Sequence, residues 1–165
     1  MKNLQFKQLL LLSDTQKKAN QFLFQKRFNL ITADDNSVGK STLAKLLLWT
    51  FGCEPDFDST WKSTDCKFLV DFSIDGTNYK ILRYQNFISL KEENKEILNY
   101  TNIGGDYSKK FAELVDCKVL LPKRGSNETE LITPPPAYYF LPFYMDQKNS
   151  WSKTWNSFGK LGQFD

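Results

Sequence analysis

The chain has 165 residues, of which 41% are hydrophobic and 15% aromatic, so it is long enough to bury a core and its composition excludes a disordered protein. Its net charge of +3 is too small to indicate nucleic-acid binding by itself. The absence of histidine excludes His-based triads, general bases and metal sites. The three cysteines have neither a disulfide-framework nor a zinc spacing, and no apolar run is long enough for a signal peptide or a membrane span. We therefore expect one domain, or part of one, in the cytoplasm, without a membrane partner.

Three strands are expected before residue 33, because three apolar-rich segments are separated by polar turns that carry lysine. They run from Phe6 to Leu12, from Asn20 to Phe24 and from Phe28 to Thr32. The run from Lys40 to Phe51 is apolar on most sides of a helix, which predicts a buried helix, and Gly52 is a suitable C-cap. The stretch over 33–39 therefore connects a predicted strand to a predicted helix.

The middle of the chain predicts antiparallel strands. Apolar and polar residues alternate over 68–74 and over 79–84, and the Asp75-Gly76 pair between them marks a tight turn, so this segment is expected to be a β-hairpin. A second pair of strands is expected around the polar turn at 92–95. Beyond it we expect a short amphipathic helix over 106–117, a loop over 122–136 that ends in three prolines, and an aromatic strand over 137–144.

The connection at 34–41, DDNSVGKS, nearly matches the phosphate-binding loop G-x-x-x-x-G-K-[ST]. Gly39, Lys40 and Ser41 stand at the required positions, but Asp34 replaces the first glycine. That glycine mainly eases the turn out of the strand, and Asp tolerates unusual backbone angles better than most residues. Because a carboxylate close to a triphosphate would repel it, we expect Asp34 to point away from the ligand. The alternative is that GKST is only a helix start with a glycine in its first turn.

The chemistry of such a loop predicts MgATP binding. Consecutive backbone amides turn inward to form an anion nest at the positive end of the following helix. Lys40 would reach the terminal phosphates, Ser41 would offer its hydroxyl to Mg²⁺, and Thr42 would contact the inner phosphates. The predicted cofactor-binding residues are Asn36, Ser37, Val38, Gly39, Lys40, Ser41 and Thr42.

The run FNLITADDNSVGKSTLAKLLLWTFGCEPDF resembles the N-terminal ATPase lobe of the SMC, RecN and RecF group of ABC-type ATPases, which opens with a phrase of the form F-N-x-I-x-G-x-N-x-x-G-K-S-x-L. Asn36 matches the loop asparagine of that group, while Ser37 stands where many members have a second glycine. The hairpin FLVDFSIDGTNYKILRY is similar to the antiparallel sheet that follows their loop. A link to defence systems of the Lamassu type rests on this resemblance.

The resemblance implies an α/β fold class: a P-loop NTPase half-domain over residues 1–165, the N-terminal lobe of an ABC or SMC head, with a largely antiparallel sheet subdomain. The segment YYFLPFYMDQ is similar to the strand that ends in the family's Q-loop, so Gln147 would act with Lys40 in catalysis and with Ser41 at Mg²⁺.

The family's Walker B carboxylates and L-S-G-G-Q signature do not occur in these 165 residues. In the family they follow a long coiled-coil insertion. We therefore expect the chain to stop before the coiled coil and to be inactive alone. It would depend on the C-terminal lobe of the same head and on a second ATPase head as a dimer.

A complete ATPase of this group would act on DNA in repair, chromosome maintenance or antiviral defence. Another function is compatible with the same residues: a non-catalytic nucleotide-binding or dimerisation module. A small-molecule kinase is a more distant alternative, because no lid-like arginine cluster follows the loop. Five basic residues could form a DNA-facing surface or could simply be solvated: Lys109, Lys110, Lys118, Lys123 and Arg124.

Overall fold

The computed structural model describes residues 2–35, 39–57, 61, 64–123 and 130–144. Within these residues the elements are, in chain order, β1 (Leu4–Ser13), β2 (Lys18–Leu23), α1 (Lys40–Thr50), β3 (Cys66–Ile74), β4 (Thr77–Tyr84), β5 (Phe87–Glu92), β6 (Ile97–Tyr100), α2 (Asp106–Leu114), β7 (Leu121–Pro122), β8 (Leu131–Ile132), α3 (Ala137–Phe140) and a 3₁₀ turn, η2 (Leu141–Phe143).

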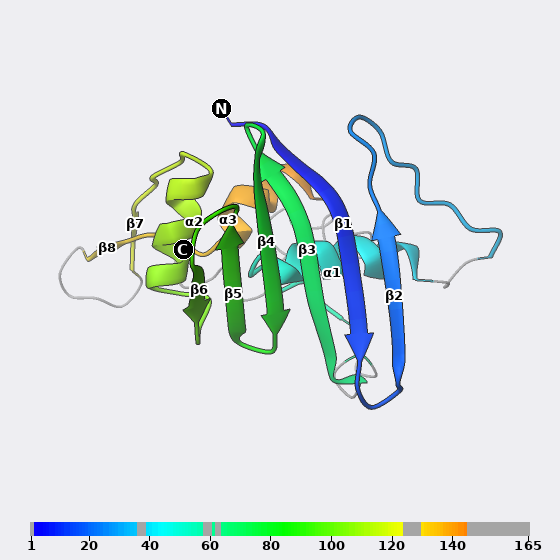
Figure 1. Ribbon diagram of the computed structural model, residues 1–165. Helices are drawn as coiled ribbons and strands as arrows, with labels where there is room; N and C mark the ends of the chain where they lie inside the picture. Colours follow the sequence, from blue (N-terminus) through cyan, green and yellow to red (C-terminus); the bar gives the residue numbers. More distant parts are fainter. Residues whose placement is uncertain (1, 36–38, 58–60, 62–63, 124–129, 145–165) are drawn as a thin grey trace, which may run out of the picture.

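Strands β1 to β6 form one antiparallel sheet in the order β2-β1-β3-β4-β5-β6, with the helices α1 and α3 behind it (Figure 1). Short turns connect β3 to β6 in sequence, as the alternating pattern of the middle segment predicted. The turn between β3 and β4 places Asp75 at φ 48 and Gly76 at φ 88, which is the left-handed geometry of an Asp-Gly hairpin turn. Both predicted strand pairs of this segment are confirmed.

The core lies between the helices and one face of the sheet, which we call the inner face. Residues that alternate along the central strands point to it, and Leu9, Val70 and Ile81 are at most 1% exposed. Phe51, just beyond α1, is completely buried, and its ring lies 4.9 Å from that of Phe72, centroid to centroid. Burying one such side chain stabilises the fold by about 1.5–3 kcal/mol, so this aromatic centre helps to hold α1 on the sheet.

Helix α1 ends close to its predicted position. Phe51 is its C-cap, and Gly52 follows in the left-handed conformation at φ 97, with its amide donating to the carbonyl oxygen of Trp49 at 2.9 Å. A side chain at Gly52 would also collide with its surroundings, because a Cβ atom there would lie 3.0 Å from Cγ2 of Ile103. Any side chain at position 52 would therefore strain the chain where it leaves the helix.

The expected α/β fold class, a P-loop NTPase half-domain, is wrong. The described chain is mostly an antiparallel six-stranded sheet with few helices, and no solved structure matches it. The expectation required a strand over Phe28–Thr32 to carry the loop, but this segment forms no strand, and Phe28 and Leu30 are 91% and 88% exposed. A strand needs a neighbour for its backbone hydrogen bonds, and the described residues supply none to this segment.

The predicted aromatic strand over 137–144 is also wrong, because the segment forms α3 and the turn η2. Pro136 adopts helical dihedral angles of φ −51 and ψ −27 and is the N-cap of α3. A proline is well suited to a helix start, since its φ is already fixed near the helical value. The preceding loop is not entirely irregular either, because β7 and β8 pair within it as a small two-stranded sheet.

Candidate functional site

The candidate site lies at the first turn of α1, which begins at Lys40. Gly39 precedes the helix in the left-handed conformation, with φ 89 and ψ 14, and its carbonyl oxygen accepts the amide of Leu43 at 3.0 Å. Among the described residues no side chain caps this end of the helix, and its first turn contains no acidic residue. The free amides and the helix dipole therefore favour an anion here.

The side chains at this helix start are accessible to a ligand. Ser41 is exposed, whereas Lys40 and Thr42 are partly buried. Lys40 Nζ donates a hydrogen bond of 2.8 Å to the backbone carbonyl oxygen of Asp35, so the lysine folds back across its own loop. Asp34, which replaces the usual glycine, is exposed. The structure thus brings Gly39, Lys40, Ser41 and Thr42 together at one helix end.

Four predicted site residues lie outside the described residues. Asn36, Ser37 and Val38 belong to the loop itself, and Gln147 belongs to the predicted Q-loop. The part of the site that the structure describes is therefore Gly39 and the first turn of α1. Among the described residues, no group of three or more His, Cys, Asp or Glu side chains is arranged to hold a metal ion.

The other end of α1 is fixed by a buried arginine that the sequence pattern did not single out. Arg83 projects from the inner face of β4 and is 1% exposed. Its Nη1 donates to the carbonyl oxygen of Trp49 and to that of Cys53, the latter at 3.2 Å. Its Nη2 donates to Oε1 of Glu54 at 2.7 Å, and its Nε donates to the carbonyl oxygen of Gln85 at 2.9 Å. The guanidinium also stacks 3.8 Å from the centroid of the Trp49 ring.

Burial controls the chemistry of this end of the helix. It lowers the pKa of Arg83, although the neighbouring carboxylate of Glu54 opposes that change. Burial also raises the pKa of the Cys53 thiol well above its ordinary value, so the thiol stays protonated and is a poor nucleophile. Tyr107 is fully buried as well, and its hydroxyl donates to the carbonyl oxygen of Phe51 at 2.9 Å. These groups position α1 and offer no reactive group.

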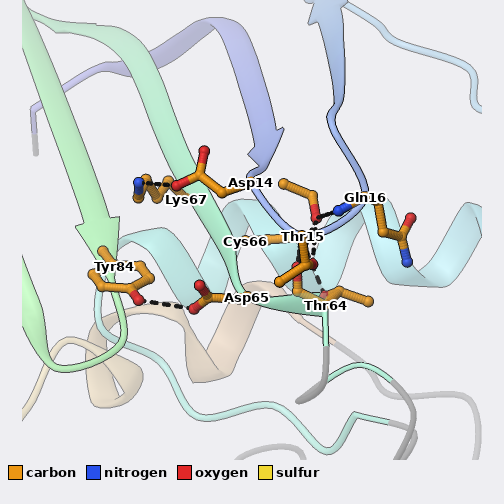
Figure 2. Close-up of polar contacts among 9 residues, drawn as sticks. Asp14, Thr15, Gln16, Thr64, Asp65, Cys66, Lys67 and Tyr84 are labelled. Carbon is orange, nitrogen blue, oxygen red and sulfur yellow. Dashed lines mark hydrogen bonds and ion pairs between the residues drawn. The ribbon is translucent and has the colours of Figure 1, made fainter.

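Figure 2 shows a polar cluster where the turn between β1 and β2 meets the start of β3. The carbonyl oxygen of Thr64 accepts hydrogen bonds from Ser13 Oγ at 2.7 Å and from Thr15 Oγ1 at 2.9 Å. The amide of Gln16 donates to Ser13 Oγ at 3.2 Å, which closes the turn. The turn is thus tied to a segment more than forty residues away in the sequence, since Ser13 and Thr64 are 51 positions apart.

The remaining members of the cluster also satisfy one another (Figure 2). Tyr84 donates to Oδ1 of Asp65 at 2.8 Å, and this hydrogen bond raises the pKa of the phenol. Lys67 forms an ion pair with Asp14, and the hydrogen bond between them raises the pKa of the lysine. Because these donors and acceptors are matched within the chain, the cluster fastens a turn and is not a ligand site.

Three of the four described lysines of the predicted DNA-facing surface lie beside acidic residues. The three ion pairs are Lys109–Asp106 at 3.5 Å, Lys110–Glu113 at 3.9 Å and Lys123–Glu130 at 3.2 Å. Lys118 is exposed, and Arg124 lies outside the described residues. The alternation of charge weakens any positive potential over α2 and its surroundings.

The chain is similar to two proteins named Lamassu protein LmuB. One is from Bacillus cereus strain VD014, with 26% identity over 165 residues, which are 100% of this chain and 28% of that protein. The other is from Bacillus sp. strain NIO-1130, with 28% identity over 136 residues, which are 82% of this chain and 23% of that protein. The chain therefore spans less than a third of the length of these curated relatives. No protein-family model matches it. Among the described residues, no helix is long and apolar enough to cross a membrane.

Proposed function

We propose that this chain belongs to a Lamassu-like antiviral defence protein. The similarity to the two proteins named Lamassu protein LmuB supports this role, because in one of them it extends over the whole chain. The proposal is tested by deleting the gene region that encodes this chain from its host and measuring phage infection. Equal plaque formation with and without the chain would contradict it.

We further propose that the helix start of α1 binds MgATP, with Asn36, Ser37 and Val38 completing the loop. The observation that carries this proposal is the left-handed Gly39 directly before an 11-residue helix whose first turn contains Lys40 and no acid. An anion nest combines left-handed and right-handed backbone conformations in successive residues, and the left-handed Gly39 directly before the helical Lys40 has this combination. This function needs only the loop and the helix start, and not an α/β sheet within the chain.

Lys40 has to exchange partners when the nucleotide binds. In the structure its ammonium group donates to a neutral carbonyl oxygen, that of Asp35, at 2.8 Å. A phosphate oxygen would be a stronger acceptor, because hydrogen bonds between ionised partners are about twice as strong as neutral ones. Ser41, which is exposed, would offer its hydroxyl to Mg²⁺, and Thr42 would contact the inner phosphates. Mg²⁺ would neutralise the charge of the phosphates.

ATP hydrolysis would require partners outside this chain. In-line attack on the γ-phosphate needs a positioned water and charge neutralisation from both sides of the phosphate. Lys40, Ser41 and, by resemblance, Gln147 would supply one side only. We propose that the C-terminal lobe of the same ATPase head and a second head, as a dimer, supply the rest, and that the assembled protein acts on DNA in the cytoplasm.

An exposed apolar segment next to the loop supports the proposal of a partner lobe. Phe28 and Leu30, just before the loop, are 91% and 88% exposed, although the segment has the composition of a strand. A strand from the partner lobe would satisfy the backbone groups of this segment and cover both side chains. The alternative function, a module that holds ATP as a structural ligand without hydrolysis, needs the same loop but no such partner.

Titration calorimetry with MgATP tests the binding site. We expect Lys40→Ala to weaken binding by at least about tenfold, since it removes the cation nearest the phosphates. Lys118→Ala, at an exposed position away from the loop, is the matched control and should bind as the unchanged chain does. Equal affinity in the Lys40→Ala protein, with its circular dichroism spectrum preserved, would contradict the site.

Measurement of released phosphate tests the dependence on partners. The chain alone should show no useful turnover, and adding the C-terminal lobe should raise the rate with a steep dependence on protein concentration. No increase on addition would favour the structural-ligand alternative. Turnover by the chain alone that is linear in its concentration and abolished by Lys40→Ala would instead indicate a self-sufficient ATPase.

A further inference from the structure

The face of the sheet opposite the helices carries leucines where a solvated face normally carries polar residues. We call it the outer face; no described element covers it, and it faces the viewer in Figure 1. Along β1 the sequence QLLLLS breaks the usual alternation, so Leu9 points inward while Leu10 and Leu12 point outward. Antiparallel sheets with one wet face alternate apolar and polar residues, and strands that are apolar on both sides belong to sheets covered on both faces.

The outward leucines form a continuous row across the centre of the sheet. Leu10 lies directly opposite Leu69 of β3, and Leu69 lies directly opposite Leu82 of β4. All three are partly exposed, and they line a shallow depression of about 620 Å³. We call Leu10, Leu69 and Leu82 the central row. Its position, flanked by strands on both sides, is that of the core of an interface and not of its rim.

Two different rows flank the line that continues the central row onto β5 at Ser89, each two residues away along β3, β4 and β5. On one side lie Lys67, Tyr84 and Phe87, which we call the aromatic row. Tyr84 and Phe87 pair directly in the register, and Nζ of Lys67 lies 5.4 Å from the centroid of the Tyr84 ring. On the other side lie Asp71, Lys80 and Lys91, which we call the charged row; each faces the next in the register. The two rows are therefore equally spaced about the central row.

The charged row lacks a complete set of partners within the described part of the chain. Oδ2 of Asp71 accepts from Gln8 at 2.7 Å and from Lys80 at 3.0 Å, but its Oδ1 has no hydrogen-bond partner. Lys80 also lies directly opposite Lys91, and like charges in directly opposed positions of a sheet are destabilising. An acidic or aromatic group over the lysines would reduce the repulsion between Lys80 and Lys91. A cation near Asp71 would give its Oδ1 atom a partner.

We propose that the outer face binds the outer face of a second copy of this chain. A twofold axis that lies in the interface, parallel to the central row, packs each central leucine against its counterpart in the other copy. The same axis places the charged row over the aromatic row: Asp71 over Lys67, Lys80 over Tyr84 and Lys91 over Phe87. Each lysine of the charged row then meets an aromatic ring, and Asp71 meets Lys67, which also pairs with Asp14 of its own chain.

This arrangement is an ordinary packing of two sheets. The axis reverses the strand direction, so the two sheets stack with nearly aligned strands at about 10 Å, as in β-sandwiches. It is isologous, so both copies use the same residues and the assembly closes at two. Nucleic acid suits this face less well, because the central leucines and Asp71 offer nothing to phosphate groups. The proposed nucleotide site plays no part in the interface, which lies on the other side of the sheet from α1.

Sedimentation velocity of the chain without nucleotide tests the proposal. We expect a concentration-dependent dimer between about 1 and 100 μM, and we expect Leu69→Lys to raise the dissociation constant at least about tenfold, because it buries a charge at the centre of the interface. Leu120→Lys is the matched control, since Leu120 is 55% exposed and lies outside the sheet. It should leave the dimer unchanged.

A charge exchange tests the position of the axis. Phe87→Lys alone should weaken the dimer, because the new ammonium group would face Lys91 of the other copy, and adding Lys91→Glu should restore it. Circular dichroism checks that each variant is folded, and Leu82→Gln replaces Leu69→Lys if the latter is not. A chain that is monomeric at about 100 μM, whatever else covers the face, would overturn the proposal. So would a folded Leu69→Lys or Leu82→Gln protein that dimerises like the unchanged chain.

Discussion

Replacing Arg83 with methionine tests whether the guanidinium holds α1 against the sheet. Methionine keeps much of the apolar volume but removes the hydrogen bonds to the carbonyl oxygens of Trp49, Cys53 and Gln85 and the ion pair with Glu54. The Trp49 oxygen keeps a second donor, a backbone amide at 2.9 Å, and the Glu54 side chain is 30% exposed, so water recovers part of the loss. Removing one partner of a buried ion pair costs about 3–5 kcal/mol, and we therefore expect about 2–4 kcal/mol here.

Urea unfolding, followed by circular dichroism and tryptophan fluorescence, measures this cost. Lys118→Met, at an exposed position, is the matched control and should change the free energy of unfolding by less than about 0.5 kcal/mol. Combining Arg83→Met with Glu54→Gln should cost less than the sum of the two single changes, because glutamine leaves no unpaired carboxylate. An Arg83→Met protein within about 0.5 kcal/mol of the unchanged chain would refute the anchoring role.

Three further predictions concern Gly52, Tyr107 and Asp34. Gly52→Ala should lower the free energy of unfolding by about 3 kcal/mol, because a Cβ atom would lie 3.0 Å from Ile103 and φ is 97. Gly76→Ala should lower it by only about 1–2 kcal/mol, because φ is 88 but the space around the residue is open. Equal losses in urea unfolding would contradict the steric argument. Burial raises the pKa of Tyr107 well above its ordinary value of about 10, so its contribution to stability should be complete below pH 10 and should be lost as the pH rises further. Tyr107→Phe should reduce the fall of the melting temperature above pH 10. An unchanged fall would contradict the role of Tyr107. Asp34→Gly should change the calorimetric affinity for MgATP by less than about tenfold, because Asp34 is exposed; a larger gain would mean that its carboxylate faces the ligand.

The hairpins could be predicted from the sequence because their signals are local. The alternation along β3 and β4 and the Asp75-Gly76 turn specify both the register and the buried face, and the structure has both as expected. The segment at 28–32 is apolar-rich between polar turns, as a strand often is, but it forms no strand. Such a composition does not show that a neighbouring strand is present. The α/β fold class failed at the same place, because it came from the loop motif and required that strand.

The failure at 137–144 has a different cause. An aromatic, apolar run of this length has no periodicity that separates a strand from a short buried helix. The prolines before it decide the outcome, because Pro136 is held in helical dihedral angles and begins α3. Three consecutive prolines are typical of an extended polyproline segment, but the last of them is equally suited to the first position of a helix. The Pro136 ring also lies near Gly52, so the loop and the end of α1 constrain each other.

The two ends of α1 differ in how far the sequence determines them. The start is local, because a glycine directly before an apolar helical run predicts where the helix begins, and α1 does begin at Lys40. The end of the helix depends on tertiary contacts, which bring together Arg83, Tyr107 and Gly52 from separate segments. Their spacing in the sequence does not predict these contacts. In the hairpin pattern Arg83 occupied an inward position, and an inward arginine was the one available signal of a buried anchor. Because α1 is anchored at its end, the proposed exchange of the Lys40 partner from the Asp35 carbonyl oxygen to a phosphate would leave the position of the helix on the sheet unchanged.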